Sequence, residues 1–242
     1  DAHVRVLMGP IGSGKTTACV MEILWLASKM KPDKDKKRRS RWAVIRNTYG
    51  ELKSTTITSW SRWATTAHTV YDAPIRSEVR MKLNDGTTVE LEVYFISMDR
   101  PQDVGKVLSM ELTGVWFNEA KQIDQKVIEA ALGRIGRYPW LRDFEMSIAP
   151  SLIQEIRHRD TTDTRRLELL NSLGFRFCAI ADTNMPFNGH HLYKKAEEER
   201  PKGWEFFKQP GALIAIKSRD GTTRYFNNPA AENVEHHILG YT

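Results

Sequence analysis

The stretch VRVLMGPIGSGKTT, residues 4–17, joins a short apolar run to a glycine-rich segment. Residues 3–8 predict a short buried strand. Residues 14–30 predict a helix that is apolar on nearly all sides and therefore deeply packed. A strand that leads through a glycine-rich turn into a helix is typical of an α/β domain around a largely parallel sheet.

Residues 9–16 complete the pattern G-x-x-x-x-G-K-[ST], which cradles the phosphates of a nucleoside triphosphate. The glycines let successive backbone N–H groups turn toward a phosphate, and Lys15 brings a point charge to the β- and γ-oxygens. Thr16 offers its hydroxyl to Mg²⁺, and the helix aims its positive end at the anion. An ordinary glycine-rich turn is the alternative, but the flanking strand and helix favour a site for ATP and Mg²⁺. The predicted nucleotide-binding residues are Gly9, Pro10, Ile11, Gly12, Ser13, Gly14, Lys15, Thr16 and Thr17.

The rest of the chain alternates predicted strands and helices. Strands are expected at 42–46, 112–117 and 175–182, and helices at 51–67, 125–132 and, interrupted by DTTDT, at 151–173. Alternating apolar residues on either side of NDG (84–86) predict a hairpin over 79–95. Together these elements predict one α/β domain with a β-hairpin.

Composition limits the class of protein. At 242 residues the chain can bury one large core, or one core plus a small subdomain. It has no apolar run of about 18 residues, so no membrane span is expected. Cys19 and Cys178 are too few for a disulfide framework, which favours a reducing cytoplasm.

Positive charge is concentrated in KPDKDKKRRSR, residues 31–41. Seven Lys or Arg and two Asp give this run +5 of the chain's net +6. A polyanion such as double-stranded DNA should therefore meet this run first. The candidate DNA contacts are Lys36, Lys37, Arg38 and Arg39. A solvated loop that only keeps the protein soluble is the alternative.

A second chemical motif is VWFNE, residues 115–119, where an apolar strand ends in two polar residues. Glu119 is predicted to polarise the attacking water. Asn118 stands where such sites usually keep an Asp, and its carbonyl oxygen could accept from a metal-bound water without adding charge. Metal binding should then be weaker, although hydrolysis stays feasible because Glu119 is present. A merely polar strand end is the alternative.

Five segments in this order resemble the ATPase domain of the large terminase subunit of tailed bacteriophages, over about 80% of the chain. They are GPIGSGKTT, RNTYGELKSTTI, ELTGVWFNEA, ADTNMPFNGHHLY and NPAAENVEHHILGY. The resemblance implies a RecA-like fold of the ASCE class, the P-loop enzymes with a catalytic Glu. It also implies a motor that packages viral double-stranded DNA into a procapsid in the host bacterial cytoplasm. The implied partners are the portal, the small terminase subunit and further copies of this chain in a ring, with a monomer expected for the isolated domain.

The resemblance also implies roles for further residues. Thr183 and Asn184 match the family's coupling motif, which senses the γ-phosphate; an ordinary strand-to-turn junction is the alternative. Many family members carry an Arg in the P-loop, where this chain has Pro10 and Ile11. Arg134 or Arg137, with Arg134 preferred, resembles the arginine that related motors insert into the next subunit. Two basic residues favourably placed after a helix C-terminus are the alternative.

The domain organisation follows from these motifs. Residues 1–205 are expected to form the ATPase core, and 206–242 a lid subdomain and the start of a linker to a nuclease domain absent from this chain. Two other functions stay open: a RecA-like helicase or recombination ATPase, and a P-loop kinase.

Overall fold

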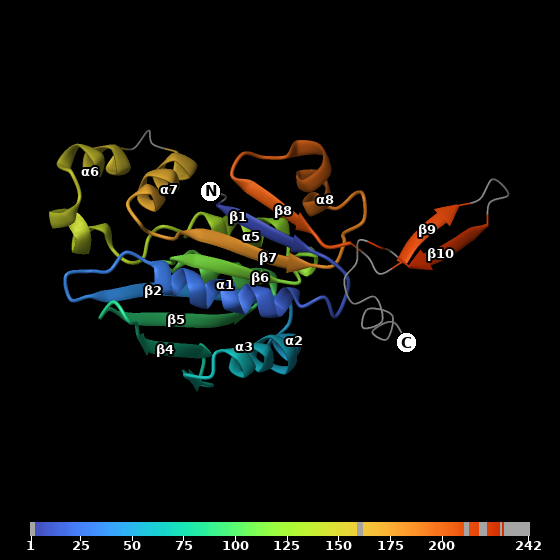
Figure 1. The fold of residues 1–242 in the computed structure, drawn as a ribbon, viewed down its shortest axis with the longest axis horizontal. Coiled ribbons are helices and arrows are strands. Elements are labelled where there is room, and N and C mark those ends of the chain that lie inside the picture. The colour runs from blue at the N-terminus through green and yellow to red at the C-terminus, as the bar shows by residue number, and fades with distance from the viewer. Residues whose placement is uncertain (1–2, 159–161, 211–212, 218–221, 228, 230–242) are drawn as a thin grey trace.

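The computed structural model describes residues 3–158, 162–210, 213–217, 222–227 and 229. Its centre is an eight-stranded sheet with the strand order β3-β4-β5-β2-β6-β7-β1-β8 (Figure 1). The pairs from β5 to β8 are parallel, and β3 and β4 are added antiparallel at one edge. The strands are β1 Val4–Met8, β2 Lys37–Arg46, β3 Ala67–Val70, β4 Arg76–Lys82, β5 Thr88–Ser97, β6 Gly114–Asn118, β7 Cys178–Thr183 and β8 Trp204–Lys208.

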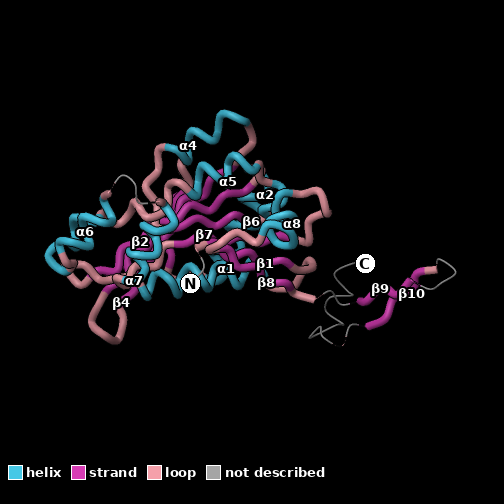
Figure 2. The backbone as a smooth tube through the Cα atoms, turned by 90° about the horizontal axis from the view of Figure 1, so that it is seen from above, coloured by secondary structure: helices cyan, strands magenta, loops and turns pink. Residues whose placement is uncertain are grey.

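Helices cover both faces of the sheet, which is why β6 and β7 are buried along their whole length. On one face, α1 (Lys15–Lys29) and α3 (Thr58–Trp63) pack with Trp42 and Trp116. On the other lie α4 (Val104–Leu108), α5 (Gln125–Leu132), α6 (Pro150–Arg157) and α7 (Asp163–Ser172). Figure 2 shows α4 and α5 on one side of the strands and α1 on the other.

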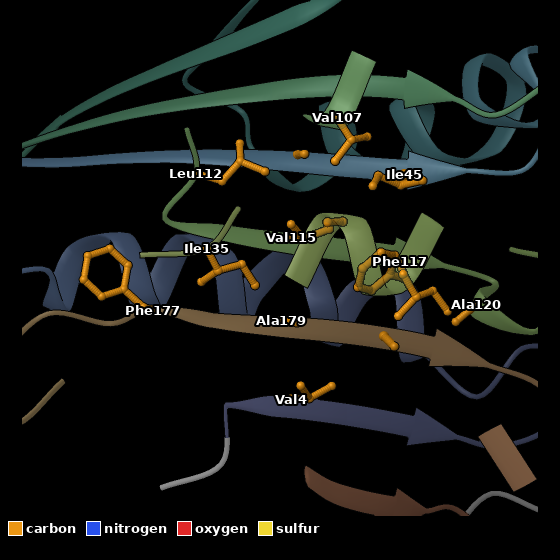
Figure 3. Packing of buried hydrophobic residues seen from close by; sticks show 14 of the residues in the cluster. Val4, Ile45, Val107, Leu112, Val115, Phe117, Ala120, Ile135, Phe177 and Ala179 are labelled. Atoms are coloured by element: carbon orange, nitrogen blue, oxygen red, sulfur yellow. The ribbon is translucent and has the colours of Figure 1, made fainter. Parts of the chain in front are cut away.

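The core under α5 is built from alternate residues of the central strands. Val115 and Phe117 of β6 and Ala179 of β7 point to the same side of the sheet (Figure 3). Their neighbours Trp116 and Ile180 pack on the α1 side instead. This alternation means that each central strand contributes to two cores, so its register is strongly determined.

Several predicted elements are confirmed within a few residues. The strand–loop–helix opening, the helix at 125–132 and the strands ending near 117 and 182 all form. The hairpin is β4–β5, and Gly86 adopts φ 80° in its turn, as NDG predicts. A second hairpin pairs β9 (Leu213–Lys217) with β10 (Thr223–Asn227).

The basic run is not a continuous loop, because β2 begins at Lys37. Its charges face acids across the parallel pair with β5: Lys37 Nζ lies 2.8 Å from Glu90, and Arg41 Nε lies 2.7 Å from Glu92. Opposite charges on neighbouring strands favour pairing where apolar residues are lacking. The apolar segment 42–46 predicted only the second half of this strand.

The helix expected at 51–67 is shorter and divided. It consists of α2 (Tyr49–Glu51), a π-helical turn at Leu52–Ile57 and α3, which ends at Trp63. Thr55 Oγ1 donates to Glu51 O at 2.7 Å, and Thr58 Oγ1 donates to Lys53 O at 3.3 Å. Threonine hydroxyls that bond the preceding turn in this way compete with regular helical geometry.

Two other expectations need correction or extension. The helix α1 is not buried on nearly all sides, because Met21 and Trp25 are 41% and 50% exposed. The sheet itself continues through β8 to Lys208, past residue 205, because β8 pairs with β1. The residues beyond 229 of the expected lid and linker lie outside the described part of the chain. Among the helices of the described residues, none is both long and apolar enough to cross a membrane.

Candidate nucleotide site

The glycine-rich loop connects the carboxyl end of β1 to the first turn of α1. Gly12 and Gly14 adopt φ of 77° and 79°, in the left-handed region that side chains disfavour. The loop is attached to the sheet by Gly9 N, which donates to Thr183 O at 3.2 Å. The backbone N–H groups at the start of α1 have no intrahelical acceptors, so the loop has the form of an anion-binding site.

Lys15 lies at the centre of this loop with 7% of its surface exposed. Its Nζ donates to Pro10 O at 2.7 Å, to Gly9 O at 3.0 Å and to Asn184 Oδ1 at 3.2 Å. Burial lowers the pKa of Lys15, while the nearby carboxylates of Asp182 and Glu119 act in the opposite direction. The ammonium group is thus held between the glycine-rich loop and the end of β7.

Residues from β6 and β7 meet the loop at the carboxyl edge of the sheet, where ligands of open α/β sheets usually bind. Glu119 follows β6 and adopts φ 54°, which is uncommon for a residue with a side chain. Its Oε2 is buried and has no hydrogen-bond partner among the described residues. A carboxylate with an unused oxygen beside the loop is suited to accept a proton from water.

Asn118 is oriented by four hydrogen bonds. Its Oδ1 accepts from Thr56 Oγ1 at 2.6 Å and from Arg46 Nη1 at 3.0 Å. Its Nδ2 donates to the two carboxylate oxygens of Asp182 at 3.0 and 3.1 Å. The carbonyl oxygen is therefore used by Thr56 and Arg46, and does not face the metal shell as the sequence led us to expect.

Asp182 is the site residue that sequence reasoning missed. It is fully buried, its Oδ1 accepts from Trp116 Nε1 at 2.6 Å, and its Oδ2 lies 3.5 Å from Thr16 Oγ1. Burial raises the pKa of Asp182, while hydrogen bonds from Asn118 and Trp116 lower it. The available signal was an acid at the end of the strand that pairs with 114–118, but a single sequence does not give that pairing.

Thr183 and Asn184 lie at the carboxyl end of β7. Thr183 is fully buried, and its Oγ1 accepts from the backbone N–H of Lys121, just after Glu119, at 3.3 Å. Asn184 contacts Lys15 directly. These two residues connect the loop, the end of β6 and the end of β7.

The two candidate finger arginines lie away from this edge. Arg134 O accepts from Leu112 N, before β6 begins, whereas Glu119 follows its end. Arg134 is half-buried with Nε donating to Met110 O at 2.9 Å, and Arg137 is exposed with Nε donating to Gly133 O at 3.1 Å. Neither belongs to the site of its own subunit, so a role in hydrolysis requires a neighbouring one.

The basic residues lie at the opposite end of β2 from the site. The strand has ten residues, so Lys37 is about 30 Å from Arg46, the residue that contacts Asn118. Arg38 pairs with Asp85 at 2.7 Å, and Arg39 Nε lies 3.2 Å from Asp33 and 3.4 Å from Glu90. Lys36 is exposed and forms no ion pair within the described part of the chain. The run is therefore less available to DNA than its net charge suggested.

The residues present fit a magnesium ion bound with nucleotide phosphates. Mg²⁺ prefers hard oxygen ligands and usually takes only one or two from protein. The Thr16 hydroxyl and the Asp182 carboxylate lie together, and the unpartnered Glu119 oxygen supports the assignment of this edge as the reacting side. Asn118 contributes no oxygen, because both of its polar atoms are used by protein groups.

No family model and no curated protein matches this chain. Among solved structures, the large terminase of a thermophilic bacteriophage is similar, with a TM-score of 0.55 and 13% identity over 86% of this chain and 40% of that one. The same terminase in complex with ADP gives a TM-score of 0.53 and 14% identity, with the same coverage. This chain therefore spans less than half of the terminase it resembles. The likeness confirms the α/β fold that the sequence predicted and shows that this chain shares that fold with part of a large terminase.

Proposed function

We propose that this chain is an ATP-hydrolysing motor domain that powers the translocation of viral double-stranded DNA into a procapsid. The observation that carries the proposal is the convergence of Lys15, Glu119 and Asn184 at one edge of a parallel sheet. The fold shared with a large terminase supports DNA packaging as the process that hydrolysis would drive. The ADP complex of that structural neighbour supports an adenine nucleotide as the ligand.

Each of these residues has a defined task in hydrolysis. The loop N–H groups and Lys15 bind the phosphates and neutralise charge on the β- and γ-oxygens. Glu119 accepts a proton from the attacking water, for which its unpartnered Oε2 is available. Mg²⁺, when bound, supplies further neutralisation of the phosphate oxygens, and Thr16 with a nearby carboxylate would hold it.

Coupling of hydrolysis to movement would begin at Asn184. Its Oδ1 accepts a hydrogen bond from the Lys15 ammonium. A bound γ-phosphate would compete with Asn184 for the same ammonium group. Loss of that phosphate changes the groups that compete for Lys15, and so changes the contact to the end of β7. A bistable contact of this kind is what a switch needs in order to respond to the nucleotide state.

The proposed partners are double-stranded DNA, the portal of the procapsid, the small terminase subunit and further copies of this chain in a ring. The site of action would be the host bacterial cytoplasm. Ring assembly is part of the proposal because neither Arg134 nor Arg137 lies near Glu119 of its own subunit.

A RecA-like helicase or recombination ATPase is the main alternative, because the same core serves both functions. A P-loop kinase is less favoured, because an available carboxylate beside the loop suits activation of water. The test is ATP hydrolysis with and without double-stranded DNA, alone and with procapsids. Hydrolysis that rises with procapsid and DNA together supports packaging. Stimulation by DNA alone favours the helicase class, and phosphate release only with an added acceptor favours a kinase.

A further inference from the structure

Asn118 and Asp182 form a pair across two parallel strands. They are register partners of β6 and β7, and the Asn118 amide donates to both oxygens of the Asp182 carboxylate. Both side chains are almost fully buried. The pair therefore carries one buried carboxylate, placed on β7.

The orientation of the Asn118 amide is determined by its surroundings. If the amide were turned over, Nδ2 would face the donors Arg46 and Thr56, and Oδ1 would face a carboxylate. Only the observed orientation satisfies all of these groups. Asn118 thus accepts a hydrogen bond from Arg46 and donates to Asp182, so it links the two side chains.

The carboxylate is also directed toward the phosphate-binding loop. Asp182 Oδ2 lies 3.5 Å from Thr16 Oγ1, the hydroxyl that is expected to bind Mg²⁺. We propose that Asp182 supplies to the Mg²⁺ shell beside Thr16 the carboxylate that Asn118 lacks. The acid of the metal site then lies on β7 and not on the neighbouring β6, and Asn118 is a positioning residue that holds it. This inference rests on the proposed ATPase function.

A purely structural role would not require a charge here. The Trp116 and Asn118 donors need only an acceptor, which an amide oxygen at position 182 would provide. Burying a carboxylate costs free energy unless the charge has a use or a strong partner. The Lys15 ammonium attracts this carboxylate without forming an ion pair with it, and a bound cation would be a closer partner.

The test measures metal binding rather than turnover. Mn²⁺ is the probe, because its free form is counted by electron paramagnetic resonance, and binding is measured on the complex with ADP. Asp182→Asn keeps Oδ1 as an acceptor for Trp116 and Asn118, so the protein should still fold. We expect ADP affinity without metal to stay within about threefold, and Mn²⁺ affinity of the ADP complex to fall by about 10–100-fold.

The exchange variant Asn118→Asp/Asp182→Asn is the matched control. It keeps the net charge and the atoms of the pair but places the acid on β6, where Arg46 and Thr56 take its oxygen, so Mn²⁺ affinity should stay as low as in Asp182→Asn. Asn118→Asp alone places two carboxylates in contact and should lower the melting temperature. If Asp182→Asn does not fold, the exchange variant decides alone.

Two results would overturn the inference while leaving the ATPase proposal intact. One is an Asp182→Asn protein that binds ADP and retains the full Mn²⁺ affinity. The other is an exchange variant that folds, binds ADP and retains the full Mn²⁺ affinity. A different result, no binding of ADP or ATP by the unmodified chain, would overturn the ATPase proposal and this inference together.

Discussion

Lys15 and Asn184 are joined by a hydrogen bond of 3.2 Å from Nζ to Oδ1, although 169 positions separate them. Lys15 follows the glycine-rich loop at the start of α1, and Asn184 follows β7. This bond joins the loop before α1 directly to the end of a central strand.

This contact predicts a difference between two substitutions of Asn184. Asn184→Asp places a carboxylate beside Lys15, where it competes with phosphate, and should weaken ATP binding by about tenfold or more, equivalent to ~1.4 kcal/mol. Asn184→Ala should leave binding nearly unchanged and slow hydrolysis. Titration calorimetry with ATP checks both. Met185→Ala is a suitable control because Met185 is 50% exposed. Equal ATP affinity of the Asp and Ala variants would show that residue 184 does not affect how Lys15 binds phosphate.

Glu119→Gln tests the base. The amide keeps the size of the side chain but cannot accept the proton, so ATP should still bind while hydrolysis falls by about 10²–10⁴-fold. Phosphate release under single-turnover conditions separates the two effects. Turnover close to that of the unmodified chain would remove Glu119 from the mechanism.

The loss of folding stability at acid pH should depend on His191. Burial lowers the pKa of His191 to about 4, and its Nε2 has no hydrogen-bond partner among the described residues. Charges of His190 and Lys195 also lower this pKa, while Asp124 and Glu129 raise it. Because the folded pKa is below the unfolded value of 6.5, stability is complete above pH 6.5 and falls as pH decreases toward 4.

His191→Asn should therefore reduce the loss of melting temperature between pH 7 and 4.5. His68→Asn serves as the control, because His68 is exposed on β3. Parallel melting curves for the His191 variant and the unmodified chain would contradict this assignment.

Within the basic run, Lys36 and Arg38 should behave differently. Arg38 contacts Asp85, Thr87 and the carbonyl of Met30, so Arg38→Gln should lower the free energy of unfolding by about 1–3 kcal/mol. Lys36→Gln should leave stability unchanged. If this edge contacts DNA, Lys36→Gln should also flatten the slope of log DNA affinity against log salt concentration by about one unit. An unchanged slope would mean that Lys36 does not contact phosphate.

The arginine that completes the site is predicted to come from a neighbouring subunit. An arginine at the transferring phosphate can raise the rate by about 10³–10⁵-fold. Arg134→Ala should keep ATP affinity and lose the part of hydrolysis that grows with protein concentration. Mixing Arg134→Ala with Glu119→Gln subunits should restore activity at interfaces that pair an intact Glu119 with an intact Arg134. Mixtures with no more activity than either variant alone would contradict the assignment, and Arg137→Ala in the same experiment shows which arginine acts.

Local patterns in the sequence predicted much of the fold. The glycine-rich loop, the helix at 125–132 and the β4–β5 hairpin depend on residues close together in the chain, and all three form. Charged β2 residues were predicted as loop because their acidic partners lie on β5, about 50 positions away. The irregular turn at Leu52–Ile57 depends on hydrogen bonds from threonine hydroxyls, which the periodicity of apolar residues does not reveal.

The sequence by itself determined the glycine-rich loop, the acid Glu119 after a buried strand and the strand end at 183–184, since each is a short motif with its own strand or helix. Only the tertiary structure decided what surrounds them. Arg46, Thr56 and Asp182 come from three different segments, and they meet Asn118 because the strand order β2-β6-β7 sets their chain ends side by side. Strand order and register follow from the packing of both cores at once, which no local pattern contains.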